Sequence, residues 1–520
     1  MKERKTIPVI DLFAGPGGLG EGFSALKDDN GKSVFRIALS IEKEEYAHQT
    51  LELRSFFRQF EKENVPEEYY KYLRGEITRN DLFKSFPEYT LKVKKESWKA
   101  ELGVNSVEEI DQKIAESLNG EANWVLIGGP PCQAYSVIGR VRQGWKNGLD
   151  EDDPRVFLYR EYYRILAVHN PPVFIMENVK GLLSSKLKNK LIFEEILHDL
   201  QNPAESYKKL KGKKKTESKC PGYFLFSLVK KPTGYDLIGK PDFEPEDFII
   251  KAEDYGIPQK RHRVIILGIR KDIFEEQPEI LEKRERVFVD KVLKSGLPKV
   301  RSGLSKETDS KENWKRILQD LNLNGFTDEI DFEVRKYITK LTRNIVVPQR
   351  DRGNEYIKYK SDIDYREEYN WFVDKRLKGV CNHSTRAHLK EDLYRYFFAS
   401  CFAEVKKKSP KLSDFPKHLL PKHKNVGKEE FEDRFRVQIW GEPARTITSH
   451  ISKDGHYYIH PDPSQCRSLT VREAARIQTF PDNYFFCGPR TSQYIQVGNA
   501  VPPLLANQIA GIVAKFLNQI

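Results

Sequence analysis

The chain has 520 residues, a formal net charge of +12 at pH 7 and an estimated pI of about 9.0. This length predicts two or more domains, and we find neither an apolar run long enough to span a bilayer nor a signal peptide. Six scattered cysteines without metal-type pairing indicate a reducing cytoplasm rather than a disulfide scaffold or a zinc site. The basic excess suits a polyanionic partner, although many basic proteins bind none.

A glycine-rich turn follows the first predicted strand, residues 7–13. Such a strand, loop and helix let the backbone approach an adenosine-containing cofactor closely. The spacing is not that of the dinucleotide fingerprint, because Leu19 follows Gly18, and this disfavours a dinucleotide oxidoreductase. A tight turn in any α/β protein is the alternative. The glycines of the turn are Gly15, Gly17, Gly18 and Gly20.

The second predicted strand, residues 35–41, ends at Glu42. An acidic residue at this position of a nucleotide-binding α/β domain can bind both ribose hydroxyls of a cofactor, although a surface carboxylate would look the same. Residues 46–123 are charged and helix-prone, and they are longer than one crossover helix requires. We therefore predict an insertion within 46–123.

Residues 125–140, VLIGGPPCQAYSVIGR, present a cysteine where a short buried strand should end. Two glycines allow a sharp turn, and Pro130 and the proline after it fix the backbone before the thiol of Cys132. The next predicted strand, residues 173–176, leads into Glu177. Parallel strands end at one edge of a sheet, so a thiol and a carboxylate are expected together where such sheets bind ligands. An ordinary buried cysteine is the alternative.

A basic segment leads into a predicted closing strand at residues 263–269, and residues 223–229 form another predicted strand. The segment YGIPQKRHR, residues 255–263, places Arg261 and Arg263 on the same side if it is extended. A basic entrance to a strand would have the same appearance.

From about residue 271 to 435, strands are hard to recognise and charge is dense and of mixed sign. We predict a second domain here, and its basic residues among aromatic ones suit a nucleic-acid surface. Beyond it we predict a hairpin over 444–460, a helix with Thr470 and Glu473 in a capping box, and a terminal apolar helix. The interleaved residues are Trp314, Tyr337, Arg343, Arg350, Arg352, Tyr356, Trp371, Arg376, His383, Arg386, His388, Tyr394 and Arg395.

Taken together, the motifs resemble those of the DNA (cytosine-5)-methyltransferases, a family common as modification enzymes of bacterial restriction–modification systems. The region 271–435 has no such match and lies where the family keeps its variable target-recognition domain. The matching segments, in order, are DLFAGPGG at 11–18, Glu42, GGPPCQ at 128–133, ENV at 177–179, QKRHR at 259–263, LTVREAARIQTFPD at 469–482 and GNAVPP at 498–503.

The resemblance implies an α/β fold, the Rossmann-like doubly wound sheet of S-adenosylmethionine-dependent methyltransferases, with a second, variable target-recognition domain. It implies a catalytic domain over 1–270, a target-recognition domain over 271–493, and a segment 494–520 that returns to the catalytic domain. The implied cofactor is S-adenosylmethionine, without a metal. The residues expected to bind it are Phe13, for which core packing is the alternative, Gly15, Gly17, Gly18, Leu19, Glu42, Pro130, Asn499 and Ala500.

The resemblance also implies a chemistry. Carbon 5 of cytosine is a poor nucleophile, and addition of the Cys132 thiolate to carbon 6 would convert the ring into an enamine-like nucleophile. Glu177 would supply a proton or hydrogen bond to ring nitrogen 3, and Arg263, with Arg261 beside it, would hold the carbonyl oxygen. The loop expected to close over the substrate carries Gln133 and Ser136.

These expectations describe a cytoplasmic, monomeric enzyme that flips a cytosine out of a specific double-stranded DNA sequence. A restriction endonuclease acting on the same site is a further expected partner, and no membrane is involved. A tRNA cytosine-5 methyltransferase is one alternative, which the large second domain disfavours. A catalytically silent DNA-binding homologue is another, which the intact set of Cys132, Glu177 and Arg263 disfavours.

Overall fold

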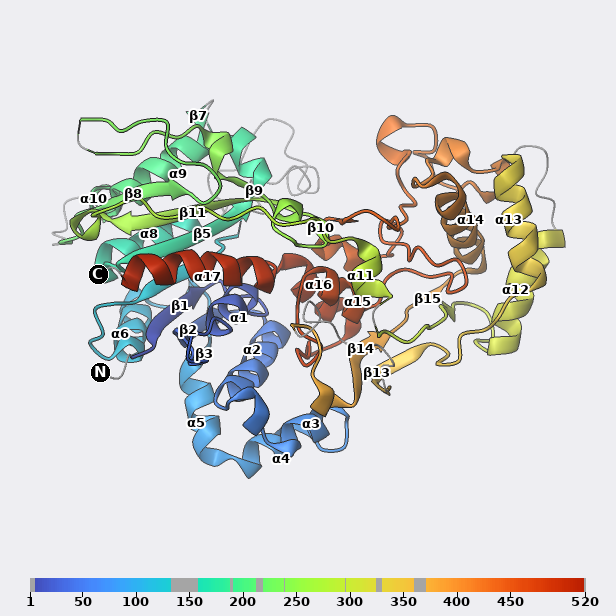
Figure 1. Cartoon of the computed structure of the whole chain (residues 1–520), viewed down its shortest axis with the longest axis horizontal. Coiled ribbons are helices and arrows are strands. Elements are labelled where there is room, and N and C mark those ends of the chain that lie inside the picture. The colour runs from blue at the N-terminus through green and yellow to red at the C-terminus, as the bar shows by residue number, and fades with distance from the viewer. Residues whose placement is uncertain are drawn as a thin grey trace.

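A computed structural model of the chain describes residues 5–131, 158–187, 190–211, 218–237, 239–294, 296–323, 330–359 and 371–518. It has two lobes, which we call the sheet lobe and the second lobe (Figure 1). The sheet lobe contains both ends of the chain, and the second lobe is built around three long helices, α12 to α14.

The sheet lobe is organised by an eight-stranded sheet with the order β3-β2-β1-β4-β5-β11-β8, and β9 also pairs with β11. Pairings from β3 to β5 are parallel, whereas β11 is antiparallel to β5, β8 and β9. The chain winds outward in one direction from β1 to β3 and in the other from β4, so the switch point lies between β1 and β4. The strands are β1 (Ile7–Leu12), β2 (Phe35–Glu42), β3 (Ser97–Lys99), β4 (Val125–Gly128), β5 (Val173–Val179), β8 (Tyr223–Ser227), β9 (Ile249–Lys251) and β11 (His262–Arg270).

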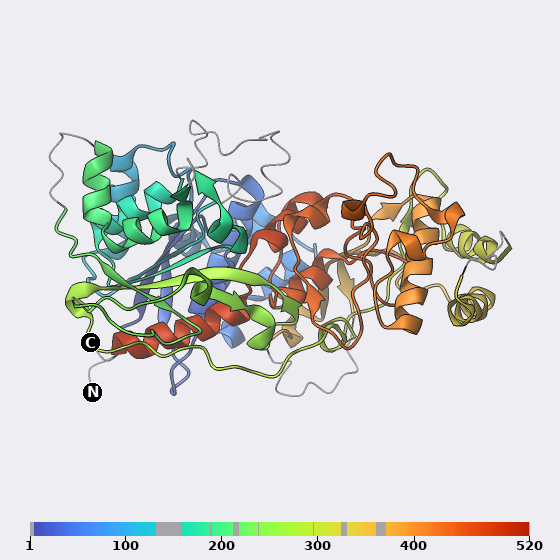
Figure 2. The same cartoon turned by 90° about the horizontal axis from the view of Figure 1, so that it is seen from above.

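Helices cover both faces of this sheet, as a doubly wound fold requires (Figure 2). Side chains of a strand alternate between its two faces, and Val9 and Ile10 of β1 accordingly enter different hydrophobic cores. The core containing Val9 is closed by α1 (Gly18–Ser24) and α17 (Pro503–Asn518). The other is closed by α6 (Val107–Leu118), α8 (Leu158–His169), α9 (Ile192–Gln201) and α10 (Pro203–Lys211). The predicted fold class is confirmed.

The predicted insertion contributes to the sheet as well as lying outside it. Within 46–123, β3 forms the edge strand and α6 closes a core. Between α2 (Glu45–Arg58) and β3, a compact group of helices packs its own aromatic core against Leu377, Cys381 and Cys487 from distant parts of the chain. We call this group the brace. It consists of α3 (Glu67–Leu73), α4 (Arg79–Ser85) and α5 (Pro87–Glu96).

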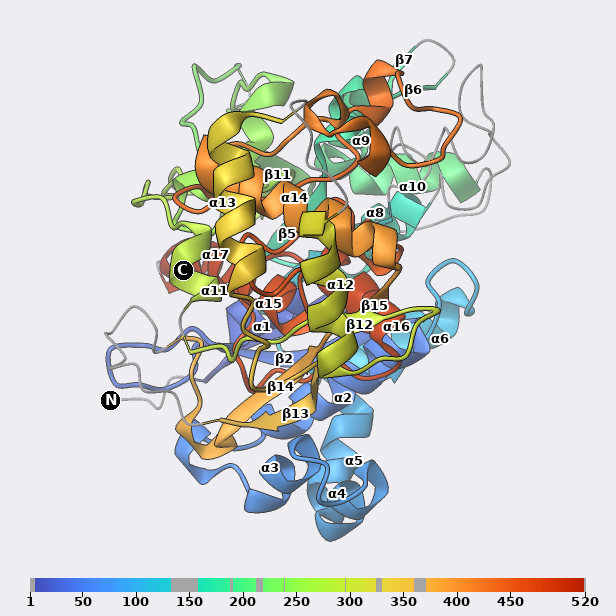
Figure 3. The same cartoon turned by 90° about the vertical axis from the view of Figure 1, so that its right-hand side faces the viewer.

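Figure 3 shows the three helices of the second lobe in front and the brace below them. Trp314, His383 and His388 are buried, so part of the aromatic and basic pattern that suggested a nucleic-acid surface belongs to the interior instead. The helices are α12 (Lys311–Leu323), α13 (Phe332–Arg343) and α14 (Lys390–Lys406). Short strands accompany them: β12 (Gly303–Leu304) with β15 (Ala387–His388), and β13 (Gly353–Lys358) with β14 (Gly379–Ser384).

The hairpin predicted over 444–460 is wrong. Residues of β16 (Ala444–Arg445) pair in parallel with β10 (Gln259–Lys260), and Ile459 bridges to Val437 and Ser468. Partners distant in sequence therefore take the backbone groups that a hairpin would have paired. The remaining elements are α11 (Val289–Leu293), α15 (Val471–Ile477), α16 (Arg490–Asn499), and a small pair, β6 (Lys186–Leu187) with β7 (Lys190–Leu191).

The capping box predicted at the start of α15 is confirmed, since the Thr470 hydroxyl accepts from Glu473 N–H and the Glu473 carboxylate accepts from Thr470 N–H. The stretch Arg490–Asn518, which spans α16 and α17, could cross a membrane by its length and composition alone, but it is mostly buried. A core helix of a globular protein has the same properties, and α17 packs against the sheet.

Candidate active site

The glycine-rich turn between β1 and α1 contains three residues with positive φ. Phe13, Gly15 and Gly17 have φ values of 55°, 58° and 92°. Glycine adopts this region freely, whereas a phenylalanine there is strained and must be held by its surroundings. The Ala14 N–H donates to the Ile41 carbonyl in β2 at 3.1 Å. The turn is therefore fixed to the neighbouring strand, and Phe13 packs partly buried at the edge of a core.

Glu42, the last residue of β2, lies against this turn. Its Oε2 accepts from the Gly15 N–H at 2.7 Å and its Oε1 from the Glu44 N–H at 2.8 Å. Burial raises the pKa of this carboxyl, and the backbone donors oppose the shift. Carboxylate oxygens have several lone pairs, so Glu42 keeps acceptor capacity for the hydroxyls of a sugar.

The ends of β4 and β5 meet at the same edge of the sheet. The Asn178 side-chain amide donates to the Pro130 carbonyl at 3.3 Å. A Cβ at Gly129 would lie 2.9 Å from Glu177 Oε2, so the glycine leaves room for that carboxylate. The two strand ends come together as predicted up to residue 131. Three predicted residues lie outside the described part of the chain: Cys132, Gln133 and Ser136.

Glu177 and Arg263 form an ion pair, with Arg263 Nε 3.0 Å from Glu177 Oε1. The antiparallel register of β5 and β11 places Ile265 opposite Glu177 and Arg263 opposite Val179, so the arginine reaches back along the sheet. Both side chains are largely buried, with 14% and 12% exposed. A cation and a carboxylate are thus held next to the backbone that leads to residue 132.

Comparison with known proteins identifies the family of the chain. The family model for C-5 cytosine-specific DNA methylases matches residues 89–207 and 239–515. The chain belongs to the C-5 cytosine-specific DNA methylases. It is 33% identical to the type II methyltransferase M.Bpa9945I of Bacillus paralicheniformis, over 98% of this chain and 99% of that one. It is 25% identical to the type II methyltransferase M.DdeI of Desulfomicrobium norvegicum, over 98% of this chain and 89% of that one.

The fold is also similar to that of a solved structure. A prophage-encoded Escherichia coli protein, assigned as a DNA modification methyltransferase, superposes with a TM-score of 0.50 at 18% identity. The match covers 99% of this chain and 100% of that one. At this identity the likeness supports the fold of this methylase alone.

Arg261 and Arg263 have different surroundings in this methylase. Arg261 is buried, and its guanidinium donates to the Ile447 carbonyl at 2.7 Å and to the Gly498 carbonyl at 3.4 Å. Burial, and next the neighbouring Arg263, lower the pKa of Arg261 well below its usual range. Arg261 therefore ties two backbone segments together, whereas Arg263 faces Glu177. The contacts give Arg261 a positioning task beside the predicted catalytic one.

The C-terminal motif packs against the glycine-rich turn. A Cβ at Gly18 would lie 2.3 Å from the Val501 carbonyl oxygen, so α1 can approach this segment only with glycine there. Ala500 is buried and Asn499 is exposed. Leu19 lies in the core, which leaves its backbone rather than its side chain for any cofactor contact. The residues predicted to bind the cofactor are thus brought to one region of the methylase.

Two glutamines that had no predicted role hold these motifs together. Gln259 Nε2 donates to the Ile477 carbonyl at 3.0 Å and to Gln478 Oε1 at 2.6 Å. Gln478 Nε2 in turn donates to the Val497 carbonyl at 2.6 Å. Both glutamines lie inside recognised motifs, QKRHR and LTVREAARIQTFPD, and that membership was the signal available from the sequence.

Two acidic residues near the cofactor region were also missed. Asp11 is buried at the end of β1, and its carboxyl oxygens make no well-formed hydrogen bond within the described chain. Burial raises the pKa of Asp11 to about 8, with Arg58 and the Gly20 N–H opposing the shift and Glu42 adding to it. Glu101 follows β3 and pairs with Lys43 at 2.9 Å. It is an acidic residue beside the third strand, and no role was predicted for it from the sequence.

A separate groove of about 1280 Å³ borders the opposite, N-terminal part of β2. Arg54, Phe57, Phe372 and Asn483 are among its lining residues. Among the residues that the structure describes, none of the predicted site residues lines this groove.

Proposed function

We propose that this C-5 cytosine-specific DNA methylase takes the methyl group from S-adenosylmethionine and adds it to cytosine within one specific duplex sequence, as the modification enzyme of a type II restriction–modification system. The observation that carries the proposal is the Glu177–Arg263 ion pair, packed against Gly129 and Pro130 two residues before Cys132. The names of the relatives M.Bpa9945I and M.DdeI support the restriction–modification assignment.

The residues around the glycine-rich turn fit the methyl donor. Glu42 lies beside the backbone of Gly15 with acceptor capacity for ribose hydroxyls, and the turn offers close backbone approach at Gly15 and Gly17. Glu101 stands beside the next strand as an acceptor for an adenine amino group. The donor supplies an electrophilic methyl group. We keep Phe13, Gly18, Leu19, Pro130, Asn499 and Ala500 as further residues of this site.

The chain's own side chains account for the steps at the base. The Cys132 thiolate adds to carbon 6, which makes carbon 5 nucleophilic. Glu177 holds ring nitrogen 3, and Arg263 stabilises the carbonyl oxygen as negative charge develops there. After methyl transfer, loss of the proton from carbon 5 expels Cys132 and restores the aromatic ring. We keep Gln133 and Ser136 as predicted substrate residues.

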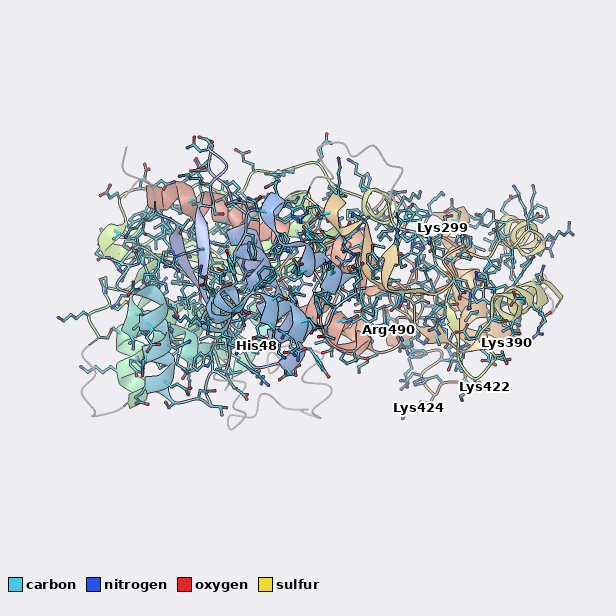
Figure 4. All side chains as sticks on the ribbon, turned by 90° about the horizontal axis from the view of Figure 1, so that it is seen from below. His48, Lys299, Lys390, Lys422, Lys424 and Arg490 are labelled. Atoms are coloured by element: carbon cyan, nitrogen blue, oxygen red, sulfur yellow. The ribbon has the colours of Figure 1, made fainter. Side chains whose placement is uncertain are left out.

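A face with exposed lysines suits the DNA backbone. Figure 4 shows Lys390, Lys422, Lys424 and Arg490 on one side of the molecule, the lower half as drawn, with His48 of the sheet lobe on the same side. Lys422 and Lys424 are exposed. Lysines that contact phosphates give sequence-independent affinity, which would help to offset the few kcal/mol required to flip a base out of the duplex.

The cellular setting follows from this function. We infer a cytoplasmic, monomeric enzyme, whose partners are double-stranded DNA and a restriction endonuclease with the same recognition sequence. The domain division at 1–270, 271–493 and 494–520 remains our proposal. The extent of the second lobe favours DNA over the alternative substrate, tRNA.

The test is transfer of labelled methyl from S-adenosylmethionine to duplex DNA and to tRNA, with purified protein. We expect label in DNA, at cytosine, and none in tRNA. Label in tRNA alone would make the protein an RNA methyltransferase. Binding to DNA without transfer, at any donor concentration, would make it a silent homologue. Sequencing of methylated cytosines in DNA from cells that express the protein would then give the recognition sequence.

A further inference from the structure

A buried polar network joins the brace, the second lobe and the C-terminal motif. At its centre is Asp374, which lies in the segment between β13 and β14 and is only 8% exposed. Asp374 Oδ2 accepts from the Tyr70 hydroxyl of α3 at 2.7 Å and from the Asn483 side-chain amide at 2.7 Å. Its Oδ1 accepts from the Arg376 N–H at 3.0 Å. Three segments far apart in the sequence thus share one carboxylate.

The network continues to the glycine-rich turn by two routes. Asn483 Oδ1 accepts from Arg54 Nη1 at 3.1 Å, and Arg54 forms a buried, bidentate ion pair with Glu21 of α1. Next to Asn483, the Tyr484 hydroxyl donates to the Pro16 carbonyl inside the turn. No more than three side chains therefore separate Asp374 from the backbone of the predicted cofactor site.

The surroundings make this network sensitive to displacement. Burial, and then the Asp374 carboxylate, raise the pKa of Tyr70, so its hydroxyl remains a donor at neutral pH. A buried acceptor or donor that loses its partner is costly, because neither water nor protein then satisfies it. A shift of the second lobe relative to α1 would break several of these bonds together, so the two parts are favoured in one relative position.

We propose that the Asp374 network couples occupation of the cofactor site to the binding of DNA by the second lobe, with Tyr70 and Asn483 as positioning residues. The proposal rests on the function proposed above. Order imposed on the glycine-rich turn by a bound cofactor passes through Tyr484, Asn483 and Arg54 to Asp374 and fixes the position of the second lobe. By linkage, DNA then tightens cofactor binding by the same factor. The brace has a functional role on this account, because α3 supplies Tyr70.

The experiment compares the dissociation constant for duplex DNA with and without saturating S-adenosylhomocysteine, in the full chain. In the wild type we expect S-adenosylhomocysteine to tighten DNA binding. In Tyr70→Phe, which removes one hydrogen bond to Asp374, we expect that ratio to fall about five-fold, the factor that corresponds to about 1 kcal/mol. The ratio is internal to each variant, so a uniform loss of affinity cancels.

Tyr72→Phe is the matched control, because Tyr72 also lies in α3 but its hydroxyl has only a 4.0 Å contact with Cys487 Sγ. It should keep the wild-type ratio. Arg376→Met is a milder second variant: Arg376 stacks on Tyr70 at 4.6 Å, donates to the Glu63 carbonyl, and is 34% exposed. It should lower the ratio about two-fold with the fold intact by thermal unfolding.

A wild-type ratio of one, or an unchanged ratio in both Tyr70→Phe and Arg376→Met, would overturn the coupling. Equal losses in Tyr72→Phe and Tyr70→Phe would overturn it too, because a general loosening of α3 would then explain both. These outcomes leave methyl transfer to DNA intact, whereas failure of the proposed function would appear as absence of transfer by the wild type.

Discussion

The motif-bearing edge of the sheet and the core of the second lobe are held together in opposite ways. At the edge, Gly18 and Gly129 bring backbone and carboxylate into contacts that no side chain would allow, and Glu177 has a charged partner. In the second lobe, α12, α13 and α14 meet through buried apolar side chains such as Trp314 and Phe397. Cores of that kind accept other apolar residues of similar volume. The edge therefore has a recognisable sequence and the lobe does not.

Of the variants that test this comparison, Glu177→Gln should have the largest effect, which is on the rate of methyl transfer. It preserves side-chain size but removes the carboxylate that pairs with Arg263 and the proton donor at the base. We expect the rate of methyl transfer to fall by about 10²–10⁴-fold, with thermal unfolding close to that of the wild type. Glu253→Gln is the control, because Glu253 pairs with His262, the neighbour of Arg263, at 2.8 Å. If Glu177→Gln kept the full rate, the acid assigned to this edge would be wrong.

Gly18→Ala tests the close approach itself. The added methyl would lie 2.3 Å from the Val501 carbonyl, and we expect the free energy of unfolding to drop by about 1–3 kcal/mol. Gly511→Ala, in α17 with open space around its Cβ position, should be neutral or stabilising by up to about 1 kcal/mol. Denaturant unfolding compares the two. Equal effects would mean that the packing of α1 against Ala500 and Val501, the residues before α17, does not depend on this glycine.

Asp11→Asn tests the effect of burying a carboxyl at the edge. The pKa of Asp11 is raised to about 8 in the folded chain, so between its unfolded value and pH 8 the folded state keeps a proton that the unfolded state has released. Stability from this group is therefore greatest at low pH and falls by about 1.4 kcal/mol per pH unit up to about pH 8. Asp11→Asn should remove this fall in stability between pH 6.5 and 8. This range lies above the titration of the buried His383 and His460, whose pKa values are lowered to about 4.

Parallel stability curves for wild type and Asp11→Asn over that range would show that Asp11 is ionised in the folded protein.

Lys422→Ala and Lys424→Ala should have the smallest effects, and they belong to the second lobe. Each removes one predicted phosphate contact, so the slope of log affinity for DNA against log salt should fall by about 0.9 per lysine. Lys299→Ala is the control: Lys299 lies on the other side of the molecule in Figure 4 and pairs with Asp462 at 2.8 Å. If Lys299→Ala lowered the salt slope as much as Lys422→Ala does, the assignment of the DNA to the face with Lys422 and Lys424 would be contradicted.

The motifs made much of the sheet lobe predictable, because each reflects a local constraint. The glycine-rich turn, Glu42 at the end of β2 and the capping box at Thr470 each depend on a few neighbouring residues, and the sequence shows them directly. The hairpin over 444–460 failed because β10, almost two hundred residues earlier, pairs with Ala444 and Arg445. Long-range pairing of this kind leaves little local signal.

The same limit explains the arginines and the second lobe. Arg261 and Arg263 alternate in sequence, but only the fold shows that one holds backbone carbonyls and the other faces Glu177. The buried His383 and His388 read as surface residues because polar side chains enter a core only when distant partners satisfy them. The role of Asp374 has the same origin, since its side-chain partners Tyr70 and Asn483 lie more than a hundred residues away.

The central claim, that this methylase acts through a covalent Cys132 adduct, is tested most directly with duplex DNA in which 5-fluorocytosine replaces cytosine. Because fluorine blocks loss of the carbon 5 substituent, we predict a complex that survives denaturation, requires S-adenosylmethionine, and is lost in Cys132→Ser but kept in Cys220→Ser. A complex that persists in Cys132→Ser, or disappears in Cys220→Ser, would contradict the account.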